Sequence, residues 1–542
     1  MNTEHDVIVE GKAKIFTNDN IFYNPVQEFN RDMSVVVLSV FAEEYKNIGQ
    51  EKILKRHHVT SSAEISQDGI VVLEALAATG LRSVRYGLEV PNIKLIYAND
   101  CSLRAVETMN RNIKENGIEH LVHTLNHDAI WLMQKFNFEN KAIHAIDLDP
   151  YGCPTRFLDS AINCISDGGL LMITCTDMAV IAGNTPETCY VKYGSISLRS
   201  CACHEMALRI ALNCVASHCG RYGKYIVPLL SVSADFYIRI FVRVFTSQRM
   251  CKQTSSNVSL VYQCTGCEMT TLHPLGLKCQ KNDNWKFYLP TGPPVSSTCI
   301  HCNHKFKLGG PIWTGPLHDF NFVNAVLLKM QNSELKTSKR IYGMLSLILE
   351  ELQDIPLYYT VDALCSKIHC QMIPLVNFRP STTYHSADSW FHSPQGSSSQ
   401  GSSPQGYKTL RRITLLSALL NAGYQVSLSH CKSNSVKTDA PQSFIWDILR
   451  CWVKKYPVSE KRLQEHSVTE SILKKCPETD VNFTFCKNAI SLSTANGLLR
   501  YQPNPLPNWG PGTRSKSKRK VIFTRIEYLY SVENKLTKKY KL

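Results

Sequence analysis

The segment Asp147-Leu148-Asp149-Pro150-Tyr151-Gly152 combines two carboxylates, a proline and an aromatic ring directly after an apolar run. An exocyclic amine on a base has a delocalised lone pair, so acceptors must orient its N–H groups before it can take a methyl group. Asp147 and the carbonyls around Pro150 can accept these hydrogen bonds, Tyr151 can stack on the base, and a carboxylate can take the proton that nitrogen loses. A polar strand end with a proline turn is the alternative. The motif predicts methyl transfer to an amine, which depends on positioning and electrostatics and requires no metal.

Further candidate residues follow three neighbouring apolar runs. Glu74 ends the first run, Gly80 lies in the turn after it, and Asp100 closes the second run, 20 residues after Gly80. Ligands of open α/β sheets bind at the carboxyl ends of the strands, so Asp100 is placed to bind a ribose hydroxyl pair. Asp128 could accept from an adenine amine, and the Ala129 N–H could donate to a ring nitrogen. The segment around Gly80 lacks the GxGxxG pattern, so an ordinary turn after the strand is the alternative there. For Asp128, the alternative is a helix N-cap.

Two arginines are candidate clamps for a carboxylate. Arg31 lies in a polar, aromatic segment without clear periodicity (residues 22–34), which we expect to close over the cofactor, and Arg82 follows the first turn. A guanidinium matches a carboxylate with two parallel hydrogen bonds. Surface or interface arginines are the alternative interpretation.

Two CxxC pairs indicate a metal site. Cys264 and Cys267 form the first pair, and Cys299 and Cys302 form the second. Four thiolates suit a closed, tetrahedral zinc site, although the interval between the pairs is long and Cys279, His301 and His304 compete as ligands. A redox pair is the lesser alternative, because neither pair lies in a thioredoxin-like βαβ setting.

From Gly69 to about Phe245, the sequence alternates between short apolar runs and helical stretches, and these elements must position the candidate residues. This alternation is typical of a mostly parallel sheet covered by helices. Two β-rich runs within residues 225–245 then follow each other almost directly, which predicts an antiparallel hairpin of the kind that class I methyltransferases append to their sheet. The other expected strands are residues 69–76, 94–100, 121–128, 142–149 and 169–177, and the expected helices are 81–86, 103–116 and an amphipathic one at 202–218.

The rest of the chain divides by composition. We expect a zinc-binding segment at 251–319 and a mainly helical α+β domain at 320–510. Within this domain, helical patterns at 340–352 and 360–368 have a helix–turn–helix spacing and suggest a winged-helix-like module. Helices are also expected at 409–424 and 443–456. A Ser/Gly/Gln tract at 386–406 predicts a disordered loop. The basic tail at 511–542 could be solvated, contact RNA or direct nuclear import.

Composition limits the classes of protein that remain possible. The chain has 542 residues, a net charge of +15 and 21 cysteines. The odd cysteine count in a large chain favours a reducing compartment, and the charge suggests either a polyanionic partner or simply a basic enzyme. Acidic and basic residues interrupt the longest apolar stretches, so we expect no membrane-spanning helix. The first ten residues resemble neither a secretory signal nor a transit peptide.

Several motifs together resemble the tRNA guanine-26 N2-dimethyltransferases, which use S-adenosylmethionine. The resemblance runs from about Gly11 to Asp319 and, more loosely, to about Pro511. The motifs that carry it are FYNPVQEFNRD (22–32), EALAATGLRSVRYGLE (74–89), AND (98–100), HDA (127–129), DLDPYG (147–152), GNTPETCYVKYG (183–194), RSCACHEMALRI (199–210), KTDAP (437–441) and NWGP (508–511). The Ser/Gly/Gln tract departs from the family, as do Cys201 and Cys203 within a matching helix.

The resemblance implies a class I methyltransferase domain at 69–250, preceded by the closing segment at 1–68 and followed by the zinc-binding segment and a C-terminal tRNA-binding domain. It implies that the enzyme makes N2-methyl- and N2,N2-dimethylguanine in tRNA, with Asp147 as the catalytic acid. It also supports the four paired cysteines as zinc ligands. The cofactor contacts carried over by motif are Arg31, Arg82, Asp100, Asp128 and Ala129, and the catalytic set that we predict is Asp147, Asp149, Pro150 and Tyr151.

Two rival functions remain at this point. One is an amino-methyltransferase for another base or for a protein amide, and the other is a tRNA-binding protein without turnover. Nuclear and cytoplasmic location is expected, with a mitochondrial pool only if an alternative start exists. We expect tRNA as the partner, no membrane contact and no obligate protein partner.

Overall fold

A computed structural model describes residues 6–17, 23–55, 69–282, 284–331, 333–370, 412–458 and 467–502. The Ser/Gly/Gln tract at 386–406 and the basic tail at 511–542 lie outside these ranges, so both expectations stay predictions. In the described part of the chain, no helix is both long and apolar enough to cross a membrane.

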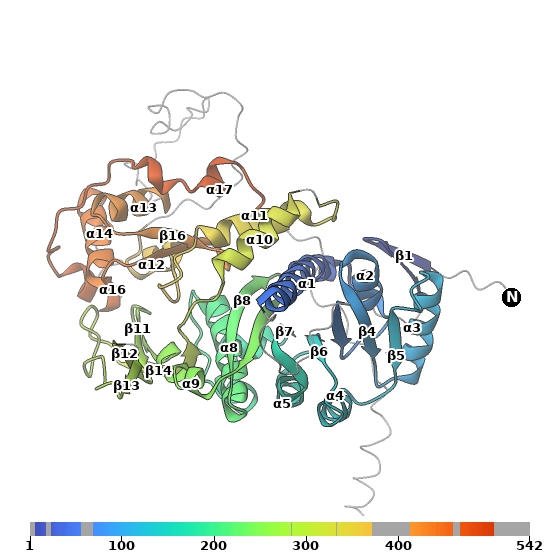
Figure 1. The fold of residues 1–542 in the computed structure, drawn as a ribbon. Coiled ribbons are helices and arrows are strands. Elements are labelled where there is room, and N and C mark those ends of the chain that lie inside the picture. Colours follow the sequence, from blue (N-terminus) through green and yellow to red (C-terminus); the bar gives the residue numbers. More distant parts are fainter. Residues whose placement is uncertain are drawn as a thin grey trace, which may run out of the picture.

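A seven-stranded sheet forms the centre of the first half of the chain (Figure 1). Its order is β5-β4-β3-β6-β7-β9-β8, and β9 runs antiparallel to both of its neighbours while β3 to β7 are parallel. The predicted parallel sheet with an appended hairpin is therefore confirmed. The strands are β3 (Ile70–Glu74), β4 (Ile93–Asn99), β5 (Val122–Leu125), β6 (Ile143–Leu148), β7 (Ile165–Cys175), β8 (Lys224–Ala234) and β9 (Tyr237–Thr246).

Helices cover both faces of this sheet, because successive side chains of a buried strand point to opposite faces. In β3, Leu73 packs into one hydrophobic core and Val72 into the other; in β6, Ile146 and Ala145 divide in the same way. The first core contains α4 (Ala129–Phe138), α5 (Thr155–Cys164) and α8 (Cys203–Arg221), and the second contains α1 (Glu28–Lys55), α2 (Leu81–Glu89) and α3 (Leu103–Glu115).

Two helices differ from the sequence expectation. The segment at 22–34, in which the sequence shows no clear periodicity, contains the 3₁₀ turn η1 (Pro25–Gln27) and the start of α1, which is buried continuously from Phe29 to Ala42. The helix α8 is not amphipathic, because every residue from Glu205 to Ala216 is buried. It packs on the sheet and also against β14 (Phe306–Trp313), and Arg209 donates to the carbonyl of Trp313. A helix covered on all sides has no polar face to produce a 3.6-residue pattern.

The N-terminal strands and the expected zinc segment form smaller sheets. Strands β1 (Asp6–Glu10) and β2 (Ala13–Thr17) pair as a hairpin, and β2 contacts α2 and α3. Next along the chain from β9 come two short helices, α9 (Gln248–Cys251) and η2 (Thr254–Asn257). Strands β10 (Val258–Cys264) and β11 (Thr270–Pro274) then join β14 in a three-stranded antiparallel sheet, while β12 (Leu277–Lys281) and β13 (Asn284–Tyr288) form a separate hairpin.

The C-terminal part is a small α+β unit, as expected. Its three-stranded sheet has the order β15-β17-β16, and the winged-helix-like module suggested by the helix pair at 340–368 stays a prediction. Its elements are α10 (Phe320–Met330), α11 (Ser338–Leu349), β15 (Tyr359–Thr360), α12 (Val361–Lys367), α13 (Arg412–Asn421), β16 (Val426–Ser429), β17 (Lys432–Thr438), α14 (Gln442–Lys455), α16 (Ser467–Leu473), η4 (Lys487–Ala489) and α17 (Leu492–Ala495). The unit lies beside the hairpin end of the large sheet (Figure 1).

Candidate active site and cysteine cluster

The predicted acids gather at the carboxyl edge of the large sheet. Glu74 at the end of β3 is the direct register partner of Asp147 in β6. Asp100 directly follows β4, and its backbone N–H donates to the carbonyl of Leu125 in β5. This is the ligand crevice of an open α/β sheet.

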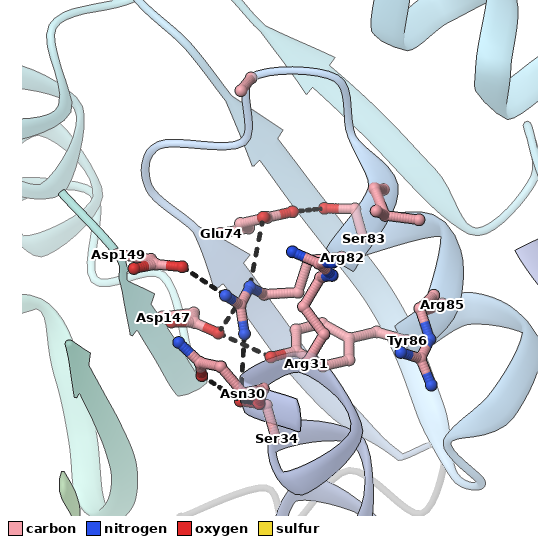
Figure 2. A network of polar contacts seen from close by, with 12 residues as sticks. Asn30, Arg31, Ser34, Glu74, Arg82, Ser83, Arg85, Tyr86, Asp147 and Asp149 are labelled. Atoms are coloured by element: carbon pink, nitrogen blue, oxygen red, sulfur yellow. Dashed lines mark hydrogen bonds and ion pairs between the residues drawn. The ribbon is translucent and has the colours of Figure 1, made fainter. Parts of the chain in front are cut away.

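Asp147 is buried among three cationic or hydroxyl groups. Arg239 from β9 donates to both of its carboxylate oxygens over 2.8 and 2.9 Å, and the Tyr86 hydroxyl donates to Oδ2 over 2.6 Å. Arg82 Nε lies 3.6 Å from the same oxygen. Burial alone would raise the pKa of Asp147, but Arg239 and Arg82 outweigh it and lower the pKa. The side chain is therefore a fixed anion at the centre of a network (Figure 2).

Arg82 connects the acids of this network. Its Nη2 donates to Asp149 and its Nη1 donates to Ser34 of α1 over 3.0 Å (Figure 2). Glu74 accepts from the Ser83 hydroxyl and lies 3.9 Å from Arg82 Nε. Complete burial raises the pKa of Glu74 to about 8, although Arg82 opposes the shift.

Arg31 lies in a different set of contacts from Arg82. Its Nε and Nη2 donate to the Glu10 carboxylate over 2.6 and 2.5 Å, and Nη2 also donates to the Asn24 carbonyl. Arg85 pairs with Glu10 over 2.8 Å. The structure therefore shows Arg31 attaching the N-terminal hairpin to α1, and its contact with a cofactor stays a prediction.

The loops at the sheet edge are ordered by their own acids. Asp100 accepts from the backbone N–H of Ala78 over 3.0 Å, which links the end of β4 to the turn after β3. In that turn, Gly80 has φ +76°, and a Cβ atom there would lie 3.0 Å from Met109. Asp128 caps α4 by accepting from Ile130 N and Trp131 N, so the N-cap role is present, and Ala129 begins the helix.

The loop after β6 presents the remaining predicted residues. Asp149 has a side chain 29% exposed, Pro150 is buried and Tyr151 is 75% exposed. The Gly152 N–H donates to the Thr176 hydroxyl over 2.7 Å, which holds the loop to the end of β7. Partial burial, Asp149 and Asp100 together raise the pKa of Tyr151. The loop therefore brings a carboxylate and an accessible ring to the edge where Asp100 also lies.

The four paired cysteines form a second cluster, at the ends of β10 and β14. All four Sγ atoms lie within 4.8 Å of one another; Cys264 and Cys302 are 3.3 Å apart, and Cys267 and Cys299 are 3.6 Å apart. Zinc bound tetrahedrally to sulfur at about 2.3 Å requires S···S distances of about 3.8 Å, so the set fits this ion.

Backbone N–H groups and the competing ligands support the same four residues. Gly266 N and His301 N each donate to a cysteine sulfur over 3.4 Å. Cys279 is exposed on β12, and His304 Nδ1 makes a hydrogen bond with the Cys302 carbonyl over 2.8 Å. Of the competing ligands, Cys279 and His304 are therefore engaged or placed elsewhere.

Sequence reasoning missed three residues of the active-site network, namely Tyr86, Ser34 and Arg239. Arg239 was detectable, because it is a charged residue inside the apolar run of β9. The others have no local signal.

A cavity of about 440 Å³ lies at the start of β8, lined by residues that include Tyr225, Trp313 and His318. None of the predicted site residues lines this cavity.

The strand order with its antiparallel β9 and the acids at the carboxyl edge of the sheet define a class I methyltransferase fold. A family model described as N2,N2-dimethylguanosine tRNA methyltransferase matches residues 3–386 and 399–450. The chain therefore belongs to this family.

Relatives and a solved structure agree with this membership. The chain is 45% identical to the tRNA (guanine(26)-N(2))-dimethyltransferase of Drosophila melanogaster, over 95% of this chain and 87% of that protein. It is 42% identical to the protein of the same name from Homo sapiens, over 95% and 78%. The complex of Trm1 from Pyrococcus horikoshii with S-adenosyl-L-methionine is similar, with a TM-score of 0.60 and 26% identity over 81% of this chain and 98% of that one.

Proposed function

We propose that this chain transfers methyl groups from S-adenosylmethionine to the exocyclic N2 of guanine 26 in tRNA, giving N2-methyl- and N2,N2-dimethylguanine. Family membership and the names of the relatives support the reaction and the substrate. The observation that carries the proposal is the loop 149–151, where a carboxylate, a proline and an accessible aromatic ring adjoin the cofactor edge of the sheet.

The cofactor fits the crevice at the ends of β3, β4 and β5. The Asp100 carboxylate suits a ribose hydroxyl pair, and the turn before Gly80 leaves no room for a side chain there. Asp128 and the Ala129 N–H would hold the adenine, and the motif resemblance adds Arg82 and Arg31 as cofactor contacts. When bound, the cofactor supplies an electrophilic methyl group, and these residues only need to hold it in line with the amine.

The two aspartates of the motif have different proposed roles. Asp147 is buried and bonded to Arg239 and Tyr86, so we assign it to positioning the network, while its role as the catalytic acid, which the resemblance implies, stays a prediction. Asp149 and the carbonyl of Pro150 accept from the guanine amine, and Tyr151 stacks on the base. Asp149 then takes the proton that the nitrogen loses.

Binding the target guanine requires it to leave its stacked position in the RNA. Extruding a base costs a few kcal/mol, which contacts with the tRNA body must offset. The net charge of +15 supports such contacts, because each lysine or arginine that meets a phosphate releases a counterion.

The four cysteines are proposed as a structural zinc site. A closed set of four thiolates leaves no open position for catalysis, and its sulfur atoms pack in the core of the C-terminal unit. Nuclear and cytoplasmic location stays a prediction; one relative, from Saccharomyces cerevisiae and 33% identical, is named as mitochondrial.

The decisive experiment is methyl transfer from labelled S-adenosylmethionine to a tRNA transcript with G26, beside the same transcript with A26. Nucleoside mass spectrometry should find dimethylguanosine only with G26. Equal labelling of both transcripts would place the reaction at another amine. Binding of both transcripts without labelling would favour a non-catalytic tRNA-binding protein.

A further inference from the structure

The hairpin of β12 and β13 is exposed on both faces. Every residue of the two strands is exposed, including Trp285, Phe287 and Tyr288, and Leu289 directly after them is 87% exposed. An isolated two-stranded hairpin is marginally stable in water, and exposed aromatic clusters mark binding surfaces. Figure 1 shows the hairpin at the end of the molecule opposite to α2 and α3. The strands β4 and β5 lie toward that opposite end (Figure 1).

The register of the hairpin sorts its side chains into two faces. Lys278 pairs with Phe287 and Gln280 pairs with Trp285, so these four residues share one face. The Lys278 ammonium lies 5.2 Å from the centre of the Trp285 ring. On the other face, Leu277 pairs with Tyr288, Cys279 with Lys286, and Lys281 with Asn284. Each face therefore combines an aromatic ring with a cation.

The surrounding segment is strongly basic. Residues 269–310 contain five lysines and one acid, Asp283. The lysines are Lys278, Lys281, Lys286, Lys305 and Lys307, all of them exposed, and none forms an ion pair with another residue that the structure describes. Exposed rings beside exposed lysines suit a polyanion with accessible bases, because bases stack on the rings while phosphates meet the lysines.

We propose that this hairpin binds tRNA away from the methylated guanine, with unpaired bases stacking on Trp285 and Phe287 on one face and with backbone phosphates meeting Lys281 and Lys286 on the other face. The proposal rests on the proposed function for the identity of the RNA. It assigns the hairpin an anchoring role that supplies binding energy toward extruding the base.

Two double variants of the full-length enzyme test the two kinds of contact separately. Trp285→Ala with Phe287→Ala should weaken binding of the G26 transcript roughly 5- to 100-fold, with an unchanged dependence on salt. Lys281→Ala with Lys286→Ala should lower the slope of log Kd against log salt by roughly 2. Phe138→Ala and Lys135→Ala change exposed residues on α4 and should leave both quantities unchanged. Unchanged binding in both hairpin variants would overturn the proposal.

A footprint places the contact without relying on turnover. Cys279 is exposed between the basic positions, so tRNA should slow its alkylation by N-ethylmaleimide, measured by peptide mass spectrometry, while exposed Cys476 serves as a reference. Equal alkylation with and without tRNA would contradict the proposal, and a crosslink from the hairpin to a protein in place of tRNA would do the same. If tRNA protects Cys279 but no dimethylguanosine forms, the surface stands and the proposed function fails. If dimethylguanosine forms while both hairpin variants bind tRNA normally, the proposed function stands and the proposed hairpin surface fails.

Discussion

Asp147 and Asp149 differ in burial although only one residue separates them. Asp147 points from the end of β6 into the sheet edge, where Arg239, Tyr86 and Arg82 surround it. Asp149 lies beyond the strand end and keeps part of its carboxylate accessible. A group that must meet a substrate needs this access, which is why we assign the substrate contact to Asp149.

Asp149→Asn should therefore lower kcat by roughly 10²- to 10⁴-fold, because the variant keeps its shape but loses the proton acceptor. Single-turnover methylation of the G26 transcript measures this change. The Kd for tRNA, measured in the same preparation, should stay within about twofold of wild type. A variant with normal kcat would exclude Asp149 as the acceptor.

Asp147→Ala should instead destabilise the folded protein. Removing this anion leaves Arg239 buried without its main partner, and breaking a buried pair from one side costs about 3–5 kcal/mol. Urea unfolding measures the loss. Asp159→Ala, at a half-exposed ion pair with His218, is the matched control and should cost less than about 1 kcal/mol.

Glu74 gives the active-site network a dependence on pH. Because burial raises its pKa to about 8, the folded protein holds a proton that the unfolded chain releases near pH 4.5. Stability should fall as pH rises from about 4.5 to 8, with a slope of at most about 1.4 kcal/mol per unit from this group. Glu74→Gln should remove this slope in urea unfolding at a series of pH values; an unaltered slope would assign the dependence to other groups.

Among the elements, α1 and α8 show how burial removes a sequence pattern. Residues 28–42 of α1 and residues 205–216 of α8 are buried on every side, so neither stretch displays the apolar stripe of a surface helix. α1 also carries Ser34, which accepts from Arg82 and Arg239. The N-terminal segment thus belongs to the core of the catalytic unit, and its expected closing over the cofactor stays a prediction.

The cysteine cluster joins β10 and β14 and contacts the core of the C-terminal unit. We expect one zinc per chain by elemental analysis of the purified protein. Cys302→Ser should lower the zinc content and the Tm, because structural zinc contributes directly to folding. Cys279→Ser removes an exposed cysteine outside the cluster and should retain full zinc. Equal zinc loss in both variants, or no zinc in wild type, would contradict the assignment.

At the scale of the whole molecule, a buried charge network joins the methyltransferase sheet to the C-terminal unit. Lys437 of β17 lies 3.1 Å from Glu205 of α8 and 2.8 Å from Glu351, and His430 makes a hydrogen bond with Glu351 over 2.9 Å. His318, Glu351 and His430 are close enough to hold a metal ion, but the Lys437 ammonium already balances the carboxylate. The network therefore fixes the two units against each other.

This network should define both limits of the pH range of stability. Burial would raise the pKa of Glu351, yet Lys437 and His430 lower it, so its contribution is lost as pH falls. Burial would lower the pKa of His430, yet Cys431 and Glu351 raise it to about 10, so its contribution is lost as pH rises toward 10. Glu351→Gln should lower the Tm most near pH 7 and much less at low pH. Exposed Glu119→Gln should change the Tm little at either pH.

Local patterns were sufficient for most of the fold. Alternating apolar runs, the adjoining β-rich pair and the two CxxC pairs are each visible within a few tens of residues, and the motif at 147–152 indicated the chemistry. These features follow from backbone periodicity and ligand spacing, which are local properties of a chain.

Only the tertiary structure showed which of the predicted active-site carboxylates are enclosed and which are accessible. Arg239 and Ser34 are 205 positions apart in the sequence, yet they meet beside Asp147 because β9 and α1 pack around the end of β6. Whether a carboxylate is enclosed or accessible depends on such distant partners. Our proposal that Asp149, and not Asp147, contacts the substrate depends on them for the same reason. The same reason explains why the helix predicted at 202–218 is not amphipathic, since burial on every side comes from elements far away in the chain.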